Sequence, residues 1–163
     1  MSYLIDGNNV MAQRVGWHRD KPGARRLLMD ELADFVRVKR VHVEVVFDGA
    51  PEPHFPDGST YRGVKIYYAE RGSNADERIK RFVDTARERR TLLVITSDRE
   101  LQTYVRRCGA QVIRSGDFRT RMEEVATAGL TLQKEDLSVK QEEMAEWMRY
   151  FGVDARDDEE NNK

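Results

Sequence analysis

Residues 91–96, Thr-Leu-Leu-Val-Ile-Thr (TLLVIT), form a continuous apolar run. Such a run is typical of a β-strand that is covered on both faces, as the strands of a parallel sheet are. Similar runs precede it at residues 2–6, 41–48 and 64–69, and another follows at residues 110–113. Parallel strands need long crossover connections, so the segments between these runs should contain helices.

Helical patterns occur where those connections require them. Residues 22–39 carry an apolar stripe at helical spacing, and Asn74 is a good N-cap for the helix expected after it. Further helices are expected at residues 98–107 and 117–128, with Gly129 ending the second. Residues 49–63 contain three of the four prolines and are expected to form a loop. The sequence therefore predicts a three-layer α/β/α fold with a central parallel sheet of about five strands. We expect the order 3-2-1-4-5, because it makes strands one and four neighbours and so brings Asp6 and Asp98 together.

The 163 residues fit one domain with an additional helix. We assign residues 1–130 to the α/β domain and residues 153–163 to an acidic, flexible tail. Between them, residues 131–152 are expected to form a helix whose apolar side chains, Met144 and Trp147 among them, pack on the domain.

Composition excludes several classes of protein. Cys108 is the only cysteine, so there is neither an internal disulfide nor a zinc-binding pattern. No apolar run is long enough to span a membrane, and the N-terminal residues do not resemble a signal peptide. We therefore expect a cytoplasmic protein with no membrane contact. The net charge of −1 argues against strong non-specific binding to nucleic acid.

Acidic residues follow the expected strands. Asp6 and Asp48 end the first two strands, Asp98 lies just after the fourth, and Asp76 begins the helix after the third. All four should meet at one edge of the sheet, at the point where the strand order reverses. Each alone would be an ordinary turn or helix-start residue, but crowded carboxylates repel one another and need a reason to be together. A hard divalent cation such as Mg²⁺, which binds carboxylates, water and substrate phosphate, is the usual reason.

Four segments in order, YLIDGNNV (3–10), FDG (47–49), SNADERI (73–79) and TSDRELQ (96–102), resemble the YacP-like branch of the NYN ribonucleases, within the PIN-like nuclease superfamily. The resemblance covers residues 1 to about 130. It implies a PIN-like fold and a metal-dependent endoribonuclease that cleaves RNA, with Mg²⁺ or Mn²⁺ as cofactor. Asp6, Asp76 and Asp98 match the family's acidic positions, and Asn8 matches the polar position after the first acid.

Roles for these residues follow from their chemistry. We expect Asp6 and Asp98 to hold the metal directly, and Asp76 to hold it through water or to orient the attacking water. Asn8 would contact the phosphate or fix a carboxylate, and Thr96 offers a hydroxyl nearby. Further candidates for the site are Asp48, Glu77, Ser97 and Glu100. Candidates for contact with the RNA backbone, on segments expected to border the acidic edge, are Arg14, Arg62, Lys65 and Arg71.

Other functions remain open. A catalytically weak RNA-binding or adaptor protein could have the same fold. A phosphatase of the haloacid dehalogenase type needs a second acid where this chain has Asn8, and no phosphate-binding loop of the G-x-x-x-x-G-K-[ST] type is present. Because the chain has no separate RNA-binding module, we expect a larger assembly, such as the ribosome, to present an RNA such as mRNA.

Overall fold

The computed structural model describes residues 1–151, apart from the side chain of Leu132. The chain divides into two compact units, residues 1–126 and residues 127–163. The predicted acidic tail, residues 153–163, lies outside the described residues.

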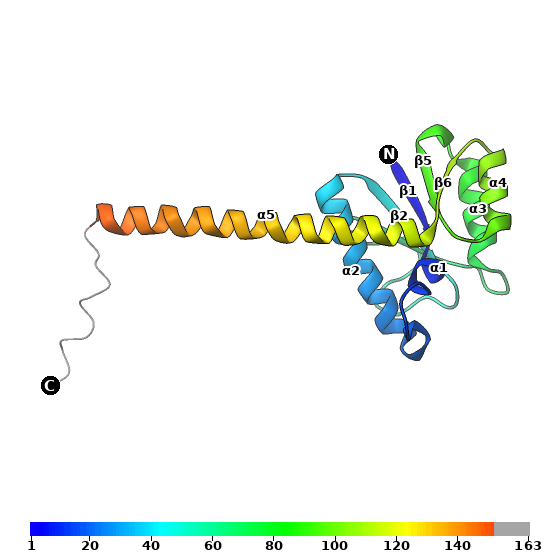
Figure 1. The fold of residues 1–163 in the computed structure, drawn as a ribbon. Coiled ribbons are helices and arrows are strands. Elements are labelled where there is room, and N and C mark those ends of the chain that lie inside the picture. The colour runs from blue at the N-terminus through cyan, green and yellow to red at the C-terminus, as the bar shows by residue number, and fades with distance from the viewer. Residues whose placement is uncertain (152–163) are drawn as a thin grey trace. The chain divides into compact units, whose positions relative to one another are not determined.

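The first unit is built on one six-stranded sheet with the order β3-β4-β2-β1-β5-β6. Figure 1 labels β1, β2, β5 and β6 of this sheet. All neighbouring strands run parallel except β3, which is antiparallel to β4. The predicted order of the five parallel strands is therefore confirmed. The strands are β1 (Ser2–Asp6), β2 (His42–Phe47), β3 (Ser59–Tyr61), β4 (Val64–Tyr68), β5 (Leu92–Ile95) and β6 (Gln111–Ile113).

Strand β3 was not predicted. The expectation that residues 49–63 form a loop is therefore wrong for Ser59–Tyr61, which make up this strand. Tyr61 pairs directly with Val64, so only Arg62 and Gly63 make the turn between the strands. Both have positive φ, at 47° and 88°, as a two-residue type I′ hairpin requires. The short hairpin strand covers the edge of β4 that would otherwise be open.

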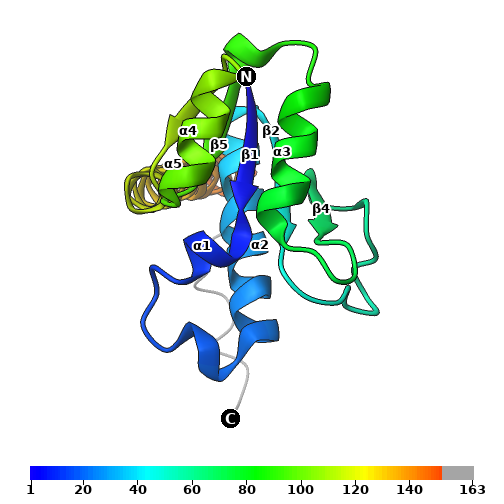
Figure 2. The same cartoon turned by 90° about the vertical axis from the view of Figure 1, so that its right-hand side faces the viewer.

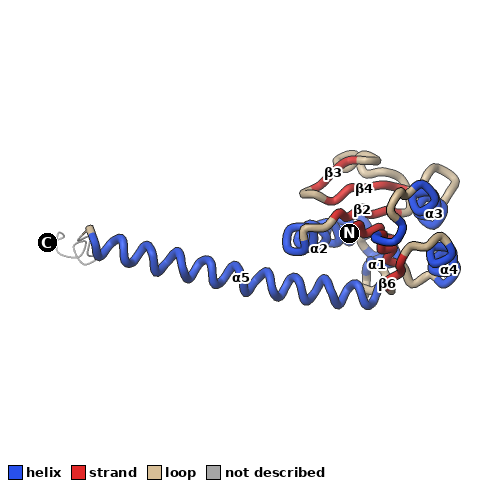
Figure 3. The backbone as a smooth tube through the Cα atoms, turned by 90° about the horizontal axis from the view of Figure 1, so that it is seen from above, coloured by secondary structure: helices blue, strands red, loops and turns tan. Residues whose placement is uncertain are grey.

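Helices cover both faces of the sheet and make the three predicted layers (Figure 3). The core on one face includes side chains of α2 and the first turns of α5, and the core on the other includes side chains of α3 and α4. The helices are α1 (Gly7–Met11), α2 (Lys21–Lys39), α3 (Ala75–Thr85), α4 (Arg99–Arg107) and α5 (Ser115–Tyr150), with 3-10 turns η1 (Trp17–Arg19) and η2 (Arg89–Thr91).

Helix α5 continues through Gly129, so the prediction that this residue ends a helix is wrong. Gly129 does not have the positive φ of a glycine at a helix C-terminus. Beyond it, Leu130, Leu137, Met144 and Trp147 are exposed. The prediction that residues 131–152 pack on the domain stays a prediction. No helix within the described residues combines the length and apolar character needed to cross a membrane.

The short helix α1 fixes the chain directly after β1. Gly7 begins it, and a Cβ atom there would lie 2.5 Å from the ring of Phe47 on β2. Only glycine lets the backbone come this close to the end of β2. The consequence is that Asp6, Asn8 and the loop after β2 are held close together at the carboxyl edge of the sheet. Figure 2 shows α1 at this end of β1.

Candidate active site

Asp6 is the only charged side chain that is buried among the described residues, with 5% of its surface exposed. Its Oδ2 atom accepts a hydrogen bond of 3.1 Å from the hydroxyl of Thr96. Burial, and then the negative charges of Asp76 and Asp48, raise the pKa of Asp6 to about 7, although the Thr96 hydroxyl and the Asn9 backbone amide oppose the rise. Asp6 therefore changes charge near neutral pH.

Asn8 and Asp48 join the ends of two strands to the start of α3. The side-chain oxygen of Asn8 accepts a hydrogen bond of 3.1 Å from the backbone N–H of Asp48. The Oδ1 atom of Asp48 in turn accepts one of 2.7 Å from the N–H of Ala75, the first residue of α3. Arg25 fixes the same turn by donating a hydrogen bond to the carbonyl of Asp48. Of the two roles predicted for Asn8, the structure shows a contact that holds the loop carrying a carboxylate.

Asp76 lies in the first turn of α3, and the acids around it change its pKa. Partial burial, followed by the charges of Asp98 and Asp48, raises the pKa of Asp76, while Lys80 partly offsets them. Four predicted acids are therefore close enough to influence one another, either directly or through Asp76. None of the four forms an ion pair with any basic side chain in the described part of the chain.

Thr96 connects Asp6 with Asp98. Its hydroxyl donates to Asp6 and accepts a hydrogen bond of 3.2 Å from the N–H of Asp98. Asp98 caps α4, because its Oδ1 accepts a hydrogen bond of 2.9 Å from the N–H of Leu101. The buried side-chain amide of Gln102 donates a hydrogen bond of 2.8 Å to the carbonyl of Thr96 and so fixes the turn that follows β5. Thr96 thus fixes the relative positions of two acids that are 92 residues apart in the sequence.

Asn9 and Ser115 are two residues of the site that the sequence analysis missed. The side-chain oxygen of Asn9 accepts hydrogen bonds from the N–H of Ser97 at 2.8 Å and from the hydroxyl of Ser115. The hydroxyl of Ser97 accepts a hydrogen bond of 3.1 Å from the N–H of Ser115. Asn9 therefore ties α1 to the loop after β5 and to the start of α5. The repeated asparagine after a strand-ending Asp was the available signal.

Two further acidic candidates are less tightly held. Glu77 is exposed on α3 and pairs with Lys80 at 3.3 Å, a contact one helical turn away. Glu100 is exposed in the first turn of α4. Both residues are close in sequence to an acid of the cluster. The described contacts include none between either of them and Asp6 or Asp98.

The four RNA-binding candidates separate into two pairs. Arg14 follows α1 and pairs with Glu31 at 2.7 Å, and Arg71 is exposed in the turn between β4 and α3, so both belong to loops at the carboxyl ends of strands. Arg62 lies in the turn before β4, and Lys65, the second residue of β4, pairs with Glu44 near the amino end of β2. For this second pair, the expectation that their segments border the acidic edge is wrong.

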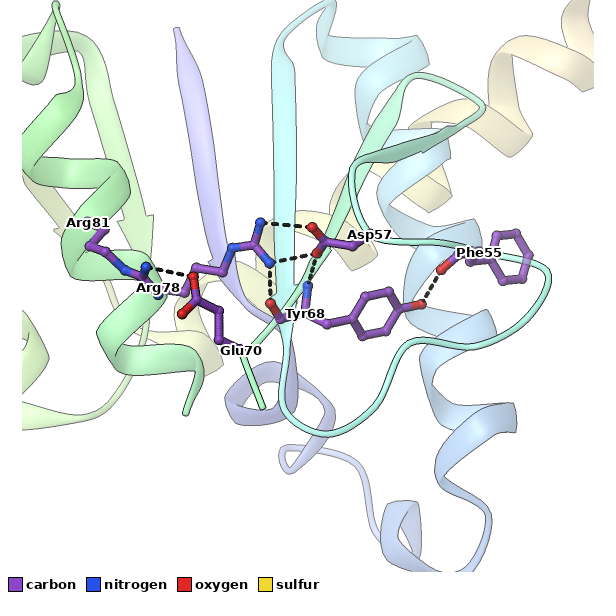
Figure 4. A network of polar contacts seen from close by, with 6 residues as sticks. All are labelled: Phe55, Asp57, Tyr68, Glu70, Arg78 and Arg81. Carbon is purple, nitrogen blue, oxygen red and sulfur yellow. Dashed lines mark hydrogen bonds and ion pairs between the residues drawn. The ribbon is translucent and has the colours of Figure 1, made fainter. Parts of the chain in front are cut away.

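A clamp centred on Arg78 fixes α3 to the sheet (Figure 4). Its guanidinium binds both carboxylate oxygens of Asp57, at 2.6 and 3.0 Å, and donates to the carbonyl of Tyr68. Burial alone would raise the pKa of Asp57, but the bonds from Arg78 and the Tyr68 amide lower it below its usual value. Next to this clamp, Glu70 and Arg81 pair at 2.7 Å. The clamp keeps the first turn of α3, and with it Asp76, at the carboxyl edge.

The donor atoms of this site suit a hard divalent ion, although a complete set of ligands is not preformed. Carboxylate oxygens are the ligands that Mg²⁺ and Mn²⁺ prefer. Within residues 1–151, no group of three or more His, Cys, Asp or Glu side chains is arranged to hold a metal ion. The geometry therefore fits an ion bound by one or two carboxylates, with water and phosphate as the remaining ligands.

The model of the YacP-like NYN domain family matches residues 3–150. The chain belongs to this family. The YacP-like NYN fold is shared with two crystal structures of Rae1 (YacP) from Bacillus subtilis. One, a point mutant, has a TM-score of 0.71 and 21% identity over 84% of this chain and 84% of that chain. The other has a TM-score of 0.67 and 21% identity, covering 93% and 92%. No curated protein matches this chain. NYN and PIN-like domains are generally nucleases, so membership of this family indicates a nuclease-type role in RNA processing.

Proposed function

We propose that this chain is a metal-dependent endoribonuclease that cleaves RNA at the acidic edge of its sheet. The observation that carries the proposal is the convergence of Asp6, Asp48, Asp76 and Asp98 with no basic side chain paired to any of them in the described structure. The fold holds these acids together at a cost in repulsion, which a bound Mg²⁺ or Mn²⁺ would remove.

Each residue has a definable task in such a site. Asp6 and Asp98 would hold the ion, and Asp76 would bind through water or orient the attacking water. The hydroxyl of Thr96 keeps the carboxylate of Asp6 in one orientation. When bound, the metal ion supplies charge stabilisation on the phosphodiester and lowers the pKa of the attacking water. Asn8 acts indirectly, by holding the turn of Asp48.

A second candidate is a catalytically weak RNA-binding adaptor. It is favoured by one feature of the geometry: Asp48 and Asp98 each use one carboxylate oxygen to bind the backbone N–H at a helix start. Helix capping alone would account for these two acids. It accounts less well for Asp6, which occupies the N-cap position of α1 without a side-chain capping hydrogen bond, is buried, and accepts a hydrogen bond from the Thr96 hydroxyl.

Cleavage assays separate the two candidates. The purified protein is incubated with a mixed RNA pool in Mn²⁺, in Mg²⁺ and in excess chelator. We expect cleavage only with metal, and a loss of several orders of magnitude in Asp6→Asn and Asp98→Asn. Asp34→Asn, which neutralises an exposed acid on α2, is the matched control and should retain full activity. Wild-type rates in both site variants would exclude the mechanism.

We further propose that a larger assembly such as the ribosome presents the RNA, for example an mRNA, in the cytoplasm. The support is the net charge of −1, which predicts modest and salt-dependent affinity for free RNA. Cleavage of one transcript is compared with and without translating ribosomes. Equal, efficient cleavage of the bare transcript would count against presentation.

A further inference from the structure

Charged side chains gather at both ends of the sheet in the first unit. The acidic cluster lies where the parallel strands end, whereas a set of basic residues lies where the strands begin. We call this set the basic belt. Its members are Lys39, Arg40, Lys65, Arg87, Arg90 and Arg107.

Topology brings the belt to one edge. Lys39 and Arg40 directly precede β2, and Lys65 is the second residue of β4. Arg87 and Arg90 lie in the segment between α3 and β5, which is at the same end of the molecule as the N-terminus (Figure 2). Arg107 ends α4, just before β6. Because these strands are parallel neighbours about 4.8 Å apart, the belt extends for about 19 Å from β4 to β6.

The belt is exposed and free of partners. All six side chains are exposed, and none forms an ion pair with an acidic side chain among the described residues. The neighbouring Arg89 is different, because its guanidinium donates to the carbonyls of Asp84 and Cys108. The side chain of Arg89 therefore has a structural role in this segment, whereas the described contacts include none made by the side chains of Arg87 and Arg90.

Helix stabilisation explains only part of the belt. Lys39 and Arg107 are in the last turns of α2 and α4, and Arg40 is the C-cap of α2, positions at which a positive charge complements the helix dipole. Lys65, Arg87 and Arg90 lie outside α-helices and have no such role. For these three residues, helix stabilisation gives no explanation, and binding of an anionic ligand would give one.

A groove of about 630 Å³ lies within this edge, and both Lys65 and Arg87 line it, together with His42. Glu44 and Glu88 also line it, so the groove itself is not uniformly basic. The six belt cations outnumber these two acids together with Asp84, which is exposed in the last turn of α3. The resulting field attracts a polyanion to this edge, while the acidic cluster, about 13 Å further along β1, repels it.

We propose that the basic belt is a docking surface for the phosphate backbone of double-helical RNA, separate from the edge at which RNA is cleaved. A row of this length can meet several successive phosphates. Within residues 1–126, no aromatic side chain is among the exposed large hydrophobic residues, so this surface is not built to stack single-stranded bases. Of the exposed large apolar residues within residues 1–126, only Met1 lies at this edge, which disfavours a membrane as the partner. The choice of RNA as the polyanion rests on the proposed function.

Binding of a fluorescein-labelled RNA duplex of about 20 base pairs, measured by anisotropy in chelator, tests the proposal without cleavage. Lys65→Glu/Arg87→Glu/Arg90→Glu should weaken binding at least tenfold and reduce the salt slope by about 2 to 3, from three lost phosphate contacts. The neutral triple Gln variant should lose less, and Glu88→Gln should bind more tightly than wild type. Arg121→Glu/Lys134→Glu/Arg149→Glu, three exposed basic residues of α5, is the control with the same change in charge.

The outcomes separate this surface from the active site. Asp6→Asn and Asp98→Asn should bind the duplex as well as wild type does, even if cleavage is lost or was never present. Equal loss of affinity in the belt triple and the α5 triple would overturn the proposal. So would unchanged binding in both triples, or binding to phosphatidylserine vesicles in place of the duplex.

Discussion

The carboxyl group of Asp6 is more stable protonated in the folded protein than in the unfolded chain. Its pKa rises from 3.8 to about 7 on folding, chiefly because the group is buried. Between these two values the folded state holds a proton that the unfolded state has lost. The contribution of Asp6 to the free energy of unfolding therefore falls as the pH rises through this range, and it levels off above pH 7.

The first prediction concerns this pH dependence without metal. Each pKa unit corresponds to about 1.4 kcal/mol, so the contribution of Asp6 lost between pH 4 and pH 7 is on the order of 4 kcal/mol. Asp6→Asn, which has no charge to bury, should lose much less stability over the same range. Urea unfolding in chelator at several pH values measures both proteins. Parallel pH profiles for the two would show that Asp6 is not the group responsible.

The second prediction separates the two roles of Asp98. Asparagine can cap α4 as aspartate does, whereas alanine cannot. Asp98→Asn should therefore unfold near the wild-type midpoint, and Asp98→Ala should lose about 1 kcal/mol because the hydrogen bond from Leu101 is removed. Both should abolish cleavage. If Asp98→Asn cleaves RNA at the wild-type rate, Asp98 is a helix cap and nothing more.

For single residues, the positions of the acids could be predicted from the sequence better than the hydrogen bonds that hold them. Asp6, Asp76 and Asp98 could be placed because each follows or begins an element with a clear pattern. The hydrogen bonds of Asn9 and Asp48 could not, because they join loops whose relative positions depend on the whole sheet. A local pattern carries no information about which amide N–H a side-chain oxygen will meet after folding.

Among the elements, the hairpin of β3 and β4 shows a residue in an unfavourable conformation. Arg62 has a φ of 47° at the first position of a type I′ turn, where Asn is preferred. Its ion pair with Asp30 spans 4.0 Å between exposed groups and contributes little to stability. The Arg-Gly turn also explains why β3 escaped sequence analysis, since the usual Asn-Gly or Asp-Gly signal is absent.

The third prediction follows from this turn. Arg62→Asn should raise the free energy of unfolding by about 0.5 to 1 kcal/mol, because asparagine tolerates the left-handed conformation better. Arg62→Ala removes the same ion pair without relieving the strain and serves as the control. Chemical denaturation compares the three proteins. A stability of Arg62→Asn at or below that of the alanine variant would contradict the conformational explanation.

For the molecule as a whole, metal binding should be linked to folding. The fourth prediction is that Mn²⁺ at about 100 times its dissociation constant raises the free energy of unfolding by roughly 2.7 kcal/mol, if it binds only the folded state. Thermal melting in chelator and in Mn²⁺ measures the shift. Asp98→Asn should show a smaller shift than wild type, while Asp34→Asn should match it. An undiminished shift in Asp98→Asn would place the ion elsewhere.

The order of the parallel strands could be predicted because their apolar runs are separated by helical patterns, and because Asp6 and Asp98 had to meet. The continuation of α5 past Gly129 could not. A single glycine costs a helix only about 1 kcal/mol, which neighbouring turns can offset. The sequence around Gly129 contains no proline to stop the helix.

The central position of β1 has a consequence for the time course of folding. This strand is synthesised before both of its partners, and Ser2 pairs with His42 on one side and Leu92 on the other. One edge of β1 therefore stays open until β5 has emerged, and a nascent chain that stops earlier exposes unpaired backbone. Asp6 and Asp98 can come together only after β5 has paired with β1. During synthesis, the protein should therefore remain unable to form its acidic edge until most of the domain has been made.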